Sequence, residues 1–338
     1  MSELKAAVIG TGGAGRLHAE AYARGRHTRL AAVVSKDAVR AEAIGAQFGV
    51  RGYTSVEEML ERERPEVVSV ATLEWEHEGP VLASLNAGAH VLCEKIMAHT
   101  VAIGEGMVAA AARAGRTLGV NYNYRSVPAH RLIKAELERG GFGAPALFAA
   151  QMHAYLWPHM FDLVRYFFGD PVEVSGAMVD DQALRPPVSG GPAGRPWEFR
   201  DSEGEMLYHP SVAASAALRF ERPDFVVSLA GSAMVPLEEN FWSFALYGRE
   251  AAVSVNAATR ANLDGTPGLG ELATKIAALP AYSYAESFAD SVARFVESVL
   301  EGRPAPVTGE DGLAVLQLDA AITEAMRTGR AVKFSSEG

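Results

Sequence analysis

Cysteine is nearly absent from this chain, whose 338 residues include only one, Cys93. A single thiol cannot form an intrachain disulfide, which excludes a disulfide-stapled scaffold and favours a reducing compartment. Long apolar runs are absent too, and none approaches the roughly 18 residues that a membrane-spanning helix needs. The first residues lead into an apolar run and a glycine cluster, without the basic region and cleavage site of a signal peptide. We therefore expect a cytoplasmic protein that does not bind membranes.

Basic residues are in deficit, with 31 Lys and Arg against 41 Asp and Glu, a formal net charge of −10. This balance argues against a nucleic-acid-binding protein. Apolar residues, in contrast, are plentiful: 49% of the chain is hydrophobic and 21% charged, which is typical of a folded protein and not of a disordered one. The length predicts about two domains.

The first third of the chain alternates between short β-branched runs and helix-length segments, several of which end in glycine. Strands interleaved with helices predict βαβ units, and therefore an α/β domain with a doubly wound parallel sheet. The second run forms a continuous block, as expected for a strand that is covered on both faces. The predicted strands are 6–9, 30–35, 67–71, 90–93 and 118–121, and the predicted helices are 14–24, 37–48, 56–62, 77–87 and 101–114.

The pattern changes after residue 125, where longer strand-like runs follow one another with few helices between them. This arrangement predicts an α+β domain with a large, mostly antiparallel open sheet. We expect domains at 1–123 and 124–338, and the sequence leaves open whether the C-terminal helices pack back on the first domain. The predicted strands are 146–151, 172–179, 212–220, 224–233, 241–247 and 251–255, the predicted helices are 129–139, 160–168, 284–301 and 310–327, and a long loop is predicted at 180–205.

The loop after the first predicted strand reads Gly10-Thr11-Gly12-Gly13-Ala14-Gly15. It matches the G-x-G-x-x-G fingerprint of Rossmann-type folds, whose glycines allow a tight turn, backbone approach to a pyrophosphate and close packing of helix on sheet. The helix that follows offers its free N–H groups and its dipole to the phosphates. An ordinary glycine-rich turn is the alternative, but the strand before the motif and the helix after it favour a site for a nicotinamide dinucleotide.

The end of the second predicted strand bears on which dinucleotide binds. An NAD site usually has a carboxylate there for the ribose hydroxyls. This chain has Ser35 and Lys36 instead, and Arg40 follows one helical turn after Lys36. Because a hydroxyl and cations suit a 2′-phosphate, we predict NADP(H) as the cofactor. NAD is the alternative, since Asp37 is within reach of a ribose, and Lys36 can also be interpreted as a solvated loop residue.

Several motifs resemble those of the Gfo/Idh/MocA family of NAD(P)-dependent oxidoreductases. They are the fingerprint with Arg16 and His18 behind it, the segment 88–95 that ends in Glu94-Lys95, Arg125-Ser126-Val127-Pro128, the His159-x-x-Asp162 helix, and the segments 287–289 and 329–332. The resemblance implies hydride transfer at a secondary alcohol or ketone of a small molecule, chiefly a sugar or cyclitol. It also implies a homodimer or homotetramer assembled through the open sheet, whose uncovered apolar face needs a partner.

Within this resemblance Lys95 is the catalytic ammonium, which stabilises the charge of the reacting oxygen from the end of a parallel strand. A lysine at a strand end is otherwise ordinarily just solvated. The family usually has proline after this lysine, with a backbone geometry that includes a cis bond, whereas this chain has Ile96, before which we expect a trans bond. The resemblance also implies cofactor contacts for Ala71, Thr72, His77 and Glu94.

His159 carries over as the proton-handling imidazole, a group whose ordinary pKa near 6.5 suits proton transfer at neutral pH. Asp162, one helical turn further, is expected to orient His159 or to cap the helix. Four residues before the histidine the family commonly has Asp, but this chain has Tyr155, whose phenol we expect to donate the proton to the reacting oxygen. A structural histidine and a packed aromatic are the alternatives. The predicted substrate-binding residues are Lys95, Asn123, Tyr124, Tyr155, His159 and Asp162.

The leading hypothesis is an NADP(H)-dependent oxidoreductase that reduces a ketone of a sugar, cyclitol or keto-sugar-like substrate. Two alternatives stay open: a lyase or glycosidase that retains its cofactor and transiently oxidises a ring hydroxyl, and a non-catalytic NAD(P)-binding regulator. No metal is predicted, because the spacing of His153, His159 and Asp162 is not that of a zinc site.

Overall fold

The computed structural model describes residues 3–179, 199–200, 206–208, 213–221, 224–232, 242–256, 270–280 and 282–335. The chain divides into two compact units, of which the first comprises Met1–Asn123 and Ala285–Leu316 and the second comprises Tyr124–Tyr284 and Gln317–Gly338. No helix in the described part of the chain has both the length and the apolar character that crossing a bilayer requires.

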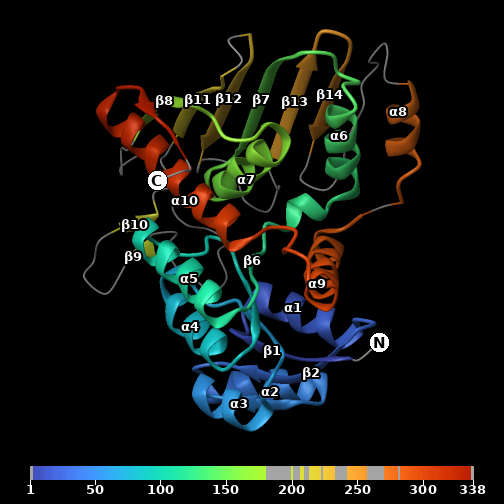
Figure 1. The fold of residues 1–338 in the computed structure, drawn as a ribbon, viewed down its shortest axis with the longest axis vertical. Helices are drawn as coiled ribbons and strands as arrows, with labels where there is room; N and C mark the ends of the chain where they lie inside the picture. The colour runs from blue at the N-terminus through green and yellow to red at the C-terminus, as the bar shows by residue number, and fades with distance from the viewer. Residues whose placement is uncertain are drawn as a thin grey trace. The chain divides into compact units, whose positions relative to one another are not determined.

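The first unit contains a six-stranded sheet in the order β3-β2-β1-β4-β5-β6, in which every neighbouring pair is parallel. The order runs outward from β1 in both directions, which confirms the predicted doubly wound Rossmann arrangement. Figure 1 labels β1, β2 and β6 of this sheet and the helices α1 to α5. Its elements are β1 (Leu4–Ile9), α1 (Gly13–Arg24), β2 (Thr28–Val34), α2 (Ala38–Phe48), β3 (Arg51–Tyr53), α3 (Val56–Glu63), β4 (Val67–Val70), η1 (Glu74–Glu76), α4 (Glu78–Asn86), β5 (His90–Cys93), α5 (Val101–Ala114) and β6 (Leu118–Val120).

Local signals in the sequence account for the helix ends of this unit. The side chains of Asp37, Ser55 and Thr100 each accept a hydrogen bond from a backbone N–H in the first turn of the helix that follows. Gly49 and Gly115 end α2 and α5 in the left-handed conformation, which glycine adopts without strain. All residues of the central strand β4 are buried, as a strand covered on both faces should be.

The second unit contains a seven-stranded sheet in the order β14-β13-β7-β12-β11-β8-β15. All neighbouring pairs are antiparallel except β12 with β7, so the predicted mostly antiparallel sheet is confirmed. The elements are η2 (Asn123–Ser126), α6 (Pro128–Glu138), β7 (Pro145–His153), η3 (Ala154–Leu156), α7 (Trp157–Phe168), β8 (Glu173–Val179), β9 (Phe199–Arg200), β10 (Met206–Tyr208), β11 (Ala213–Arg219), β12 (Val226–Ser232), β13 (Trp242–Gly248), β14 (Ala252–Asn256), α8 (Gly270–Ala277), α10 (Gly309–Thr328) and β15 (Val332–Lys333).

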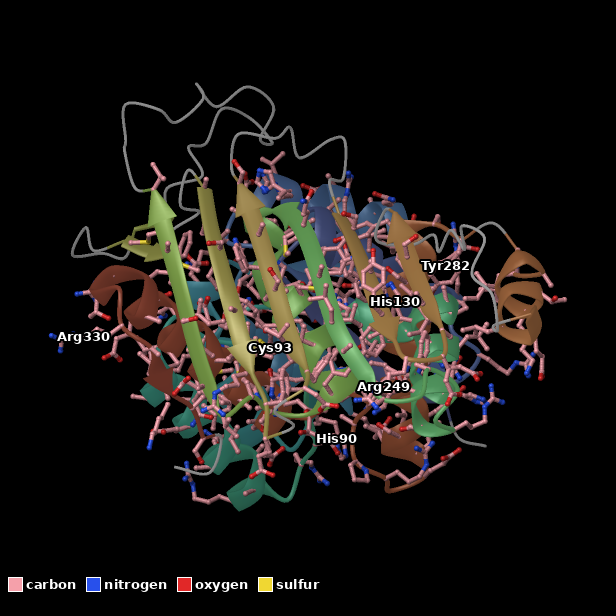
Figure 2. All side chains as sticks on the ribbon, turned by 90° about the horizontal axis from the view of Figure 1, so that it is seen from above. His90, Cys93, His130, Arg249, Tyr282 and Arg330 are labelled. Carbon is pink, nitrogen blue, oxygen red and sulfur yellow. The ribbon has the colours of Figure 1, made fainter. Side chains whose placement is uncertain are left out.

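The two faces of this second sheet differ in chemistry. Buried and less buried positions alternate along β7, β11, β12 and β13, as the period of a strand requires. Phe148, Leu229 and Phe244 lie on the buried face. In Figure 2 the strands of this sheet lie toward the viewer, and no described helix crosses in front of them. The sheet is therefore open on one side within the described residues.

Besides the short turns η1, η2 and η3, five elements were not expected from the sequence: β3, β9, β10, β15 and the helix α8. These four strands have two or three residues each, which is too short for a periodic pattern to stand out. The predicted loop 180–205 contains the short strand β9, which pairs with β10, and its other residues lie outside the described ones. Three residues at the ends of predicted strands, Val212, Ala233 and Phe241, also lie outside the described residues.

The helix α9 (Tyr284–Leu300) belongs to the first unit, although it follows the strands β7–β14 of the second sheet in the sequence. Its buried Val292, Phe295 and Val296 share an apolar cluster with residues of β1 and β2, among them Val8 and Val33. Burial of this apolar face supplies the free energy that holds α9 there. The next helix, α10, begins in the first unit and ends in the second.

Candidate active site

The glycine loop has the geometry that its sequence predicts. Gly10 has a φ of +99°, which L-residues with a side chain rarely adopt, and a Cβ there would overlap the carbonyl of Ala71. A Cβ at Gly15 would overlap the carbonyl of Gly10, so α1 can approach the sheet only with glycine at this position. The first and last glycines of the fingerprint are thus required by the fold itself.

The N-terminus of α1 has the features of an anion cradle. Gly12 is the N-cap and provides no side-chain hydrogen bond, and a Cβ at Gly12 or Gly13 would meet no described atom within 4 Å. The hydroxyl of Thr11 is buried and has no hydrogen-bond partner among the described residues. Ala14 follows in the first turn. Free helix N–H groups, open space and an unsatisfied hydroxyl together fit the pyrophosphate of a dinucleotide.

The residues after β2 lie at the carboxyl end of the same sheet. Asp37 accepts a hydrogen bond from the backbone N–H of Arg40 at 3.1 Å and so caps α2. The hydroxyl of Ser35 accepts one from the N–H of Asp37 at 3.3 Å. Lys36 forms an ion pair with Glu76 of η1 at 2.8 Å, a contact that no sequence pattern indicated. The carboxylate nearest to β2 in the sequence is therefore engaged in helix capping.

Lys95 directly follows Glu94 at the end of β5 and is partly buried. The Lys95–Ile96 peptide bond is cis, so the expectation of a trans bond before isoleucine was wrong. The segment is fixed by contacts that the sequence pattern does not reveal. His77 is fully buried, and its Nδ1 lies 3.0 Å from the carbonyl oxygen of Ile96 and 3.3 Å from that of Met97.

The other ring nitrogen of His77, Nε2, lies 3.3 Å from the carbonyl oxygen of Thr72 in the loop after β4. Burial lowers the pKa of His77, although Glu74 and Glu94 raise it, and a neutral ring then donates from only one of its nitrogens. His77 thus connects the loops that follow β4 and β5. Contact of His77, Ala71 or Thr72 with a cofactor stays a prediction.

Behind Lys95, buried polar side chains form what we call the Glu94 network. Oε1 of Glu94 lies 2.8 Å from Nε2 of His18 on α1 and accepts a hydrogen bond from Asn121 at 2.5 Å. Nδ1 of His18 lies 2.9 Å from the hydroxyl of Ser69 on β4, which in turn lies 2.8 Å from that of Tyr22. Glu94 and the residues behind it are all buried.

Helix α9 completes the Glu94 network. Its Ser291 donates a hydrogen bond to Oδ1 of Asn121 at 2.6 Å, and its Ser287 accepts one from Asn123 at 2.6 Å. Burial raises the pKa of Glu94, but the hydrogen bonds from His18 and Asn121 and the charge of Lys95 outweigh it, so the pKa lies below its ordinary value. Glu94 is therefore a carboxylate at neutral pH, and its predicted contact with the cofactor stays a prediction.

Two predicted site residues of the second unit, Tyr124 and His159, are in direct contact. The ring of His159 stacks on that of Tyr124 with 4.3 Å between centroids, and Trp242 meets Tyr124 edge-on at 4.9 Å. Burial raises the pKa of Tyr124, and the neighbouring Tyr155 raises it further. Tyr155 is partly buried, and its backbone N–H donates to Nδ1 of His153 at 3.0 Å. His159 is thus in ring contact with Tyr124, and Tyr155 is near enough to influence the pKa of Tyr124.

Asp162 is buried and accepts two hydrogen bonds from the Arg125 guanidinium, at 2.9 and 2.7 Å. This bidentate ion pair joins η2 to α7. Asp162 lies inside α7 and so does not cap the helix, whereas its expected role in orienting His159 stays a prediction. The pairing arises because a buried carboxylate needs a cation, and Arg125 supplies one with matching geometry. Arg125 was visible as part of a motif, but nothing in the sequence linked it to Asp162.

Comparison with known protein families decides how these features are interpreted. Residues 4–122 match the Gfo/Idh/MocA oxidoreductase family through its NAD-binding Rossmann fold, and residues 152–334 match its C-terminal alpha/beta domain. The chain belongs to this family. It is therefore an NAD(P)-dependent oxidoreductase, as the motifs predicted.

Individual Gfo/Idh/MocA proteins resemble the chain over nearly its whole length. It is 29% identical over 315 residues to a 1,5-anhydro-D-fructose reductase from Ensifer adhaerens, covering 91% of each chain. It is 24% identical to a myo-inositol 2-dehydrogenase from Thermotoga maritima, covering 98% of each. An oxidoreductase from Agrobacterium radiobacter, solved in complex with NAD+, L-tartaric acid and magnesium, shares the fold with a TM-score of 0.78 and 19% identity over 98% of each chain.

Proposed function

We propose that this Gfo/Idh/MocA protein uses NADPH to reduce a ketone of a sugar or cyclitol-like substrate to the secondary alcohol. The observation that carries the proposal is the position of Lys95, which follows β5 at the carboxyl end of the sheet whose first strand leads into the glycine loop. Ligands of open α/β sheets bind at that end. The names of the Ensifer and Thermotoga relatives, a reductase of an anhydro-sugar and a dehydrogenase of a cyclitol, support the substrate class.

The preference for NADPH rests on the residues after β2. Ser35 and Lys36 occupy the positions where an NAD site usually has a carboxylate, and Asp37 is engaged as the cap of α2. The side chain of Arg40 is exposed and makes no hydrogen bond or ion pair with any described residue. A hydroxyl and two cations form a suitable environment for a 2′-phosphate.

Bound NADPH supplies the hydride. The Lys95 ammonium holds the substrate oxygen and stabilises its negative charge as the carbonyl carbon is reduced. We assign Tyr155 as the proton donor of the reaction and His159 as its proton-handling imidazole. The product is a secondary alcohol, and the net reaction consumes one hydride and one proton.

We further propose that two or four copies assemble through the open sheet. One row across that face consists only of serine and alanine, namely Ser254, Ala245, Ala149, Ser228, Ala217 and Ser175 on six neighbouring strands. Small side chains let a second sheet approach closely, and exposed Val226 and Tyr247 lie on the neighbouring row. The single cysteine of the chain is consistent with a cytoplasmic location.

The test is a substrate survey followed by one variant. Purified protein with NADPH is given 1,5-anhydro-D-fructose and other ketones, while NADP+ with myo-inositol tests the reverse direction, and absorbance of reduced nicotinamide is followed. Lys95→Met should lower turnover by roughly 10²–10³-fold and leave NADPH binding intact. Substrate consumption without any net change in absorbance would overturn the proposal in favour of a retained cofactor, and unchanged turnover of Lys95→Met would remove the role of the ammonium.

A further inference from the structure

The loops that follow β2 and β4 are joined by an ion pair. Nζ of Lys36 lies 2.8 Å from Oε1 of Glu76, across 40 positions of sequence. The Lys36 side chain is 81% exposed and that of Glu76 31% exposed, so the pair lies at the surface, where it can exchange partners. Because β2 and β4 both pair with β1 in parallel, these loops leave the sheet at the same end.

This ion pair occupies one of the two cations on which the proposed 2′-phosphate site depends. The Arg40 guanidinium makes no hydrogen bond or ion pair within the described residues, whereas the charge of Lys36 is neutralised by Glu76. Ser35 contributes a hydroxyl, and the N–H of Asp37 already donates to it. A phosphate that binds Lys36 must therefore displace the Glu76 carboxylate or lie beside it. The 2′-hydroxyl of NADH carries no charge, so NADH can bind without displacing the Glu76 carboxylate and without lying beside it as an anion.

We propose that Glu76 determines the degree of discrimination between NADPH and NADH, by holding Lys36 and so weakening the site for the 2′-phosphate. The inference rests on the proposed function, in which a nicotinamide dinucleotide binds the glycine loop and its 2′-phosphate lies beside Ser35, Lys36 and Arg40. Glu76 acts on one cofactor selectively, because the pyrophosphate and nicotinamide halves are common to both. With Glu76 present, the chain should prefer NADPH over NADH by a smaller factor than Ser35, Lys36 and Arg40 would give without it.

The experiment compares dissociation constants of NADPH and NADH for the full chain, measured by titration of protein fluorescence or by calorimetry. Glu76→Gln removes the charge and keeps the shape of the side chain. We expect it to tighten NADPH binding by about two- to fivefold, the range that a solvent-exposed ion pair is worth, and to leave NADH binding unchanged within error. Added salt should shrink the difference between the two proteins.

A matched control is available in the same turn of η1. Glu74 is also partly buried and carries the same charge two residues away, yet it forms no ion pair with Lys36. Glu74→Gln should therefore leave the ratio of the two dissociation constants as it is in the wild type. If Glu74→Gln tightens NADPH as much as Glu76→Gln does, the effect is one of overall charge and the proposal is overturned.

A double-mutant cycle tests whether Glu76 acts through Lys36. In a Lys36→Met background the gain from Glu76→Gln should fall to half or less. An undiminished gain would show that Glu76 does not act through the ion pair and would overturn the inference. The two proposals fail differently: wild-type protein that binds neither nucleotide overturns the proposed function, whereas tight NADPH binding with an unchanged ratio in Glu76→Gln overturns only the role of Glu76.

Discussion

In the first unit the residues behind Lys95 are joined by hydrogen bonds between buried polar side chains, whereas in the second unit the residues around His159 are joined by aromatic contacts. The two kinds of support fail in different ways. Removing one partner from a buried polar network leaves another group charged or without a hydrogen bond. In the low dielectric of the interior, that loss destabilises the fold strongly. Stacked aromatic rings depend instead on volume and shape. Four experiments sharpen this contrast.

The largest effect is expected for His18→Leu. The substitution leaves the buried Glu94 carboxylate with Asn121 as its main hydrogen-bond donor in the Glu94 network. We expect the free energy of unfolding to fall by about 3–5 kcal/mol, as measured by urea denaturation at pH 7. Glu94 has a lowered pKa, so the stability from its ionised form is present above the ordinary value of 4.5 and is lost as the pH falls through the lowered value. The deficit of His18→Leu should therefore shrink in acid.

The control is the double variant His18→Leu/Glu94→Leu, which removes the carboxylate together with its partner. It should recover at least about 1 kcal/mol relative to His18→Leu alone, because no buried charge is left unpaired. Equal instability of the single and double variants would mean that the loss arises from packing, and the contrast between the two units would disappear.

A second prediction concerns His130, which packs among the aromatic residues of the second unit. Its Nδ1 lies 2.9 Å from the carbonyl oxygen of Tyr124, and its Nε2 has no partner among the described residues. Burial lowers the pKa of His130 from 6.5 to about 4. Between these values the unfolded chain binds a proton that the folded chain does not, so stability rises with pH across this window. The shift in the pKa of His130 lowers the free energy of unfolding by about 3 kcal/mol between pH 6.5 and pH 4.

The measurement is the free energy of unfolding between pH 4 and 7 for the wild type and for His130→Phe. The phenyl ring keeps the aromatic volume and cannot be protonated, so the variant should have a clearly flatter profile. His27→Gln, at a partly exposed position of the first unit, serves as the control and should follow the wild type. Parallel profiles for His130→Phe and the wild type would contradict the prediction.

The third prediction tests whether Tyr155 of the second unit acts as a proton donor or only packs against its neighbours. Tyr155→Phe removes only the phenol oxygen of a partly buried residue. If that phenol protonates the reacting oxygen, kcat should fall about 10²-fold while KM changes little. Unchanged kcat would reduce Tyr155 to a packing role, and a rise in KM alone would assign it to substrate binding.

The smallest effect is expected for Ser291→Ala, which removes the hydrogen bond from α9 to Asn121. We expect a loss of about 1 kcal/mol of unfolding free energy. The control is Ser298→Ala on the same helix, whose hydroxyl bonds only to the carbonyl of Phe295 within α9. That variant should lose less, and equal losses would show that the hydrogen bond to Asn121 adds nothing to stability.

The same contrast explains what could be predicted from the sequence. The glycine fingerprint, the alternation of strands and helices, and the Glu94-Lys95 segment are local patterns, and for that reason the sequence alone indicates the parallel sheet and the family. The Glu94 network contains hydrogen bonds between residues up to 170 positions apart, and no spacing rule connects His18 with Ser291. The pairing of Arg125 with Asp162 and that of Lys36 with Glu76 escaped prediction for the same reason.

The cis bond at Ile96 marks another limit of what the sequence can predict. The expectation of a trans bond followed from the ordinary preference of non-proline residues, but the neighbouring segment is fixed by His77, which lies 19 positions earlier. The predicted roles of Lys95, Tyr155 and His159 depend on the substrate, and they remain predictions that the substrate survey tests.

The position of α9 has a consequence for how such a protein can be recombined. A fragment that stops at Asn123 would lack the helix that covers Val8 and Val33 and that completes the hydrogen bonding of Asn121. The first 123 residues alone therefore do not make up the complete first unit. A chimaera or a split reporter built from this unit would have to include residues 285–316 as well. Grafting a new second unit onto this scaffold would mean replacing residues 124–284 between the two pieces of the host and residues 317–338 after them.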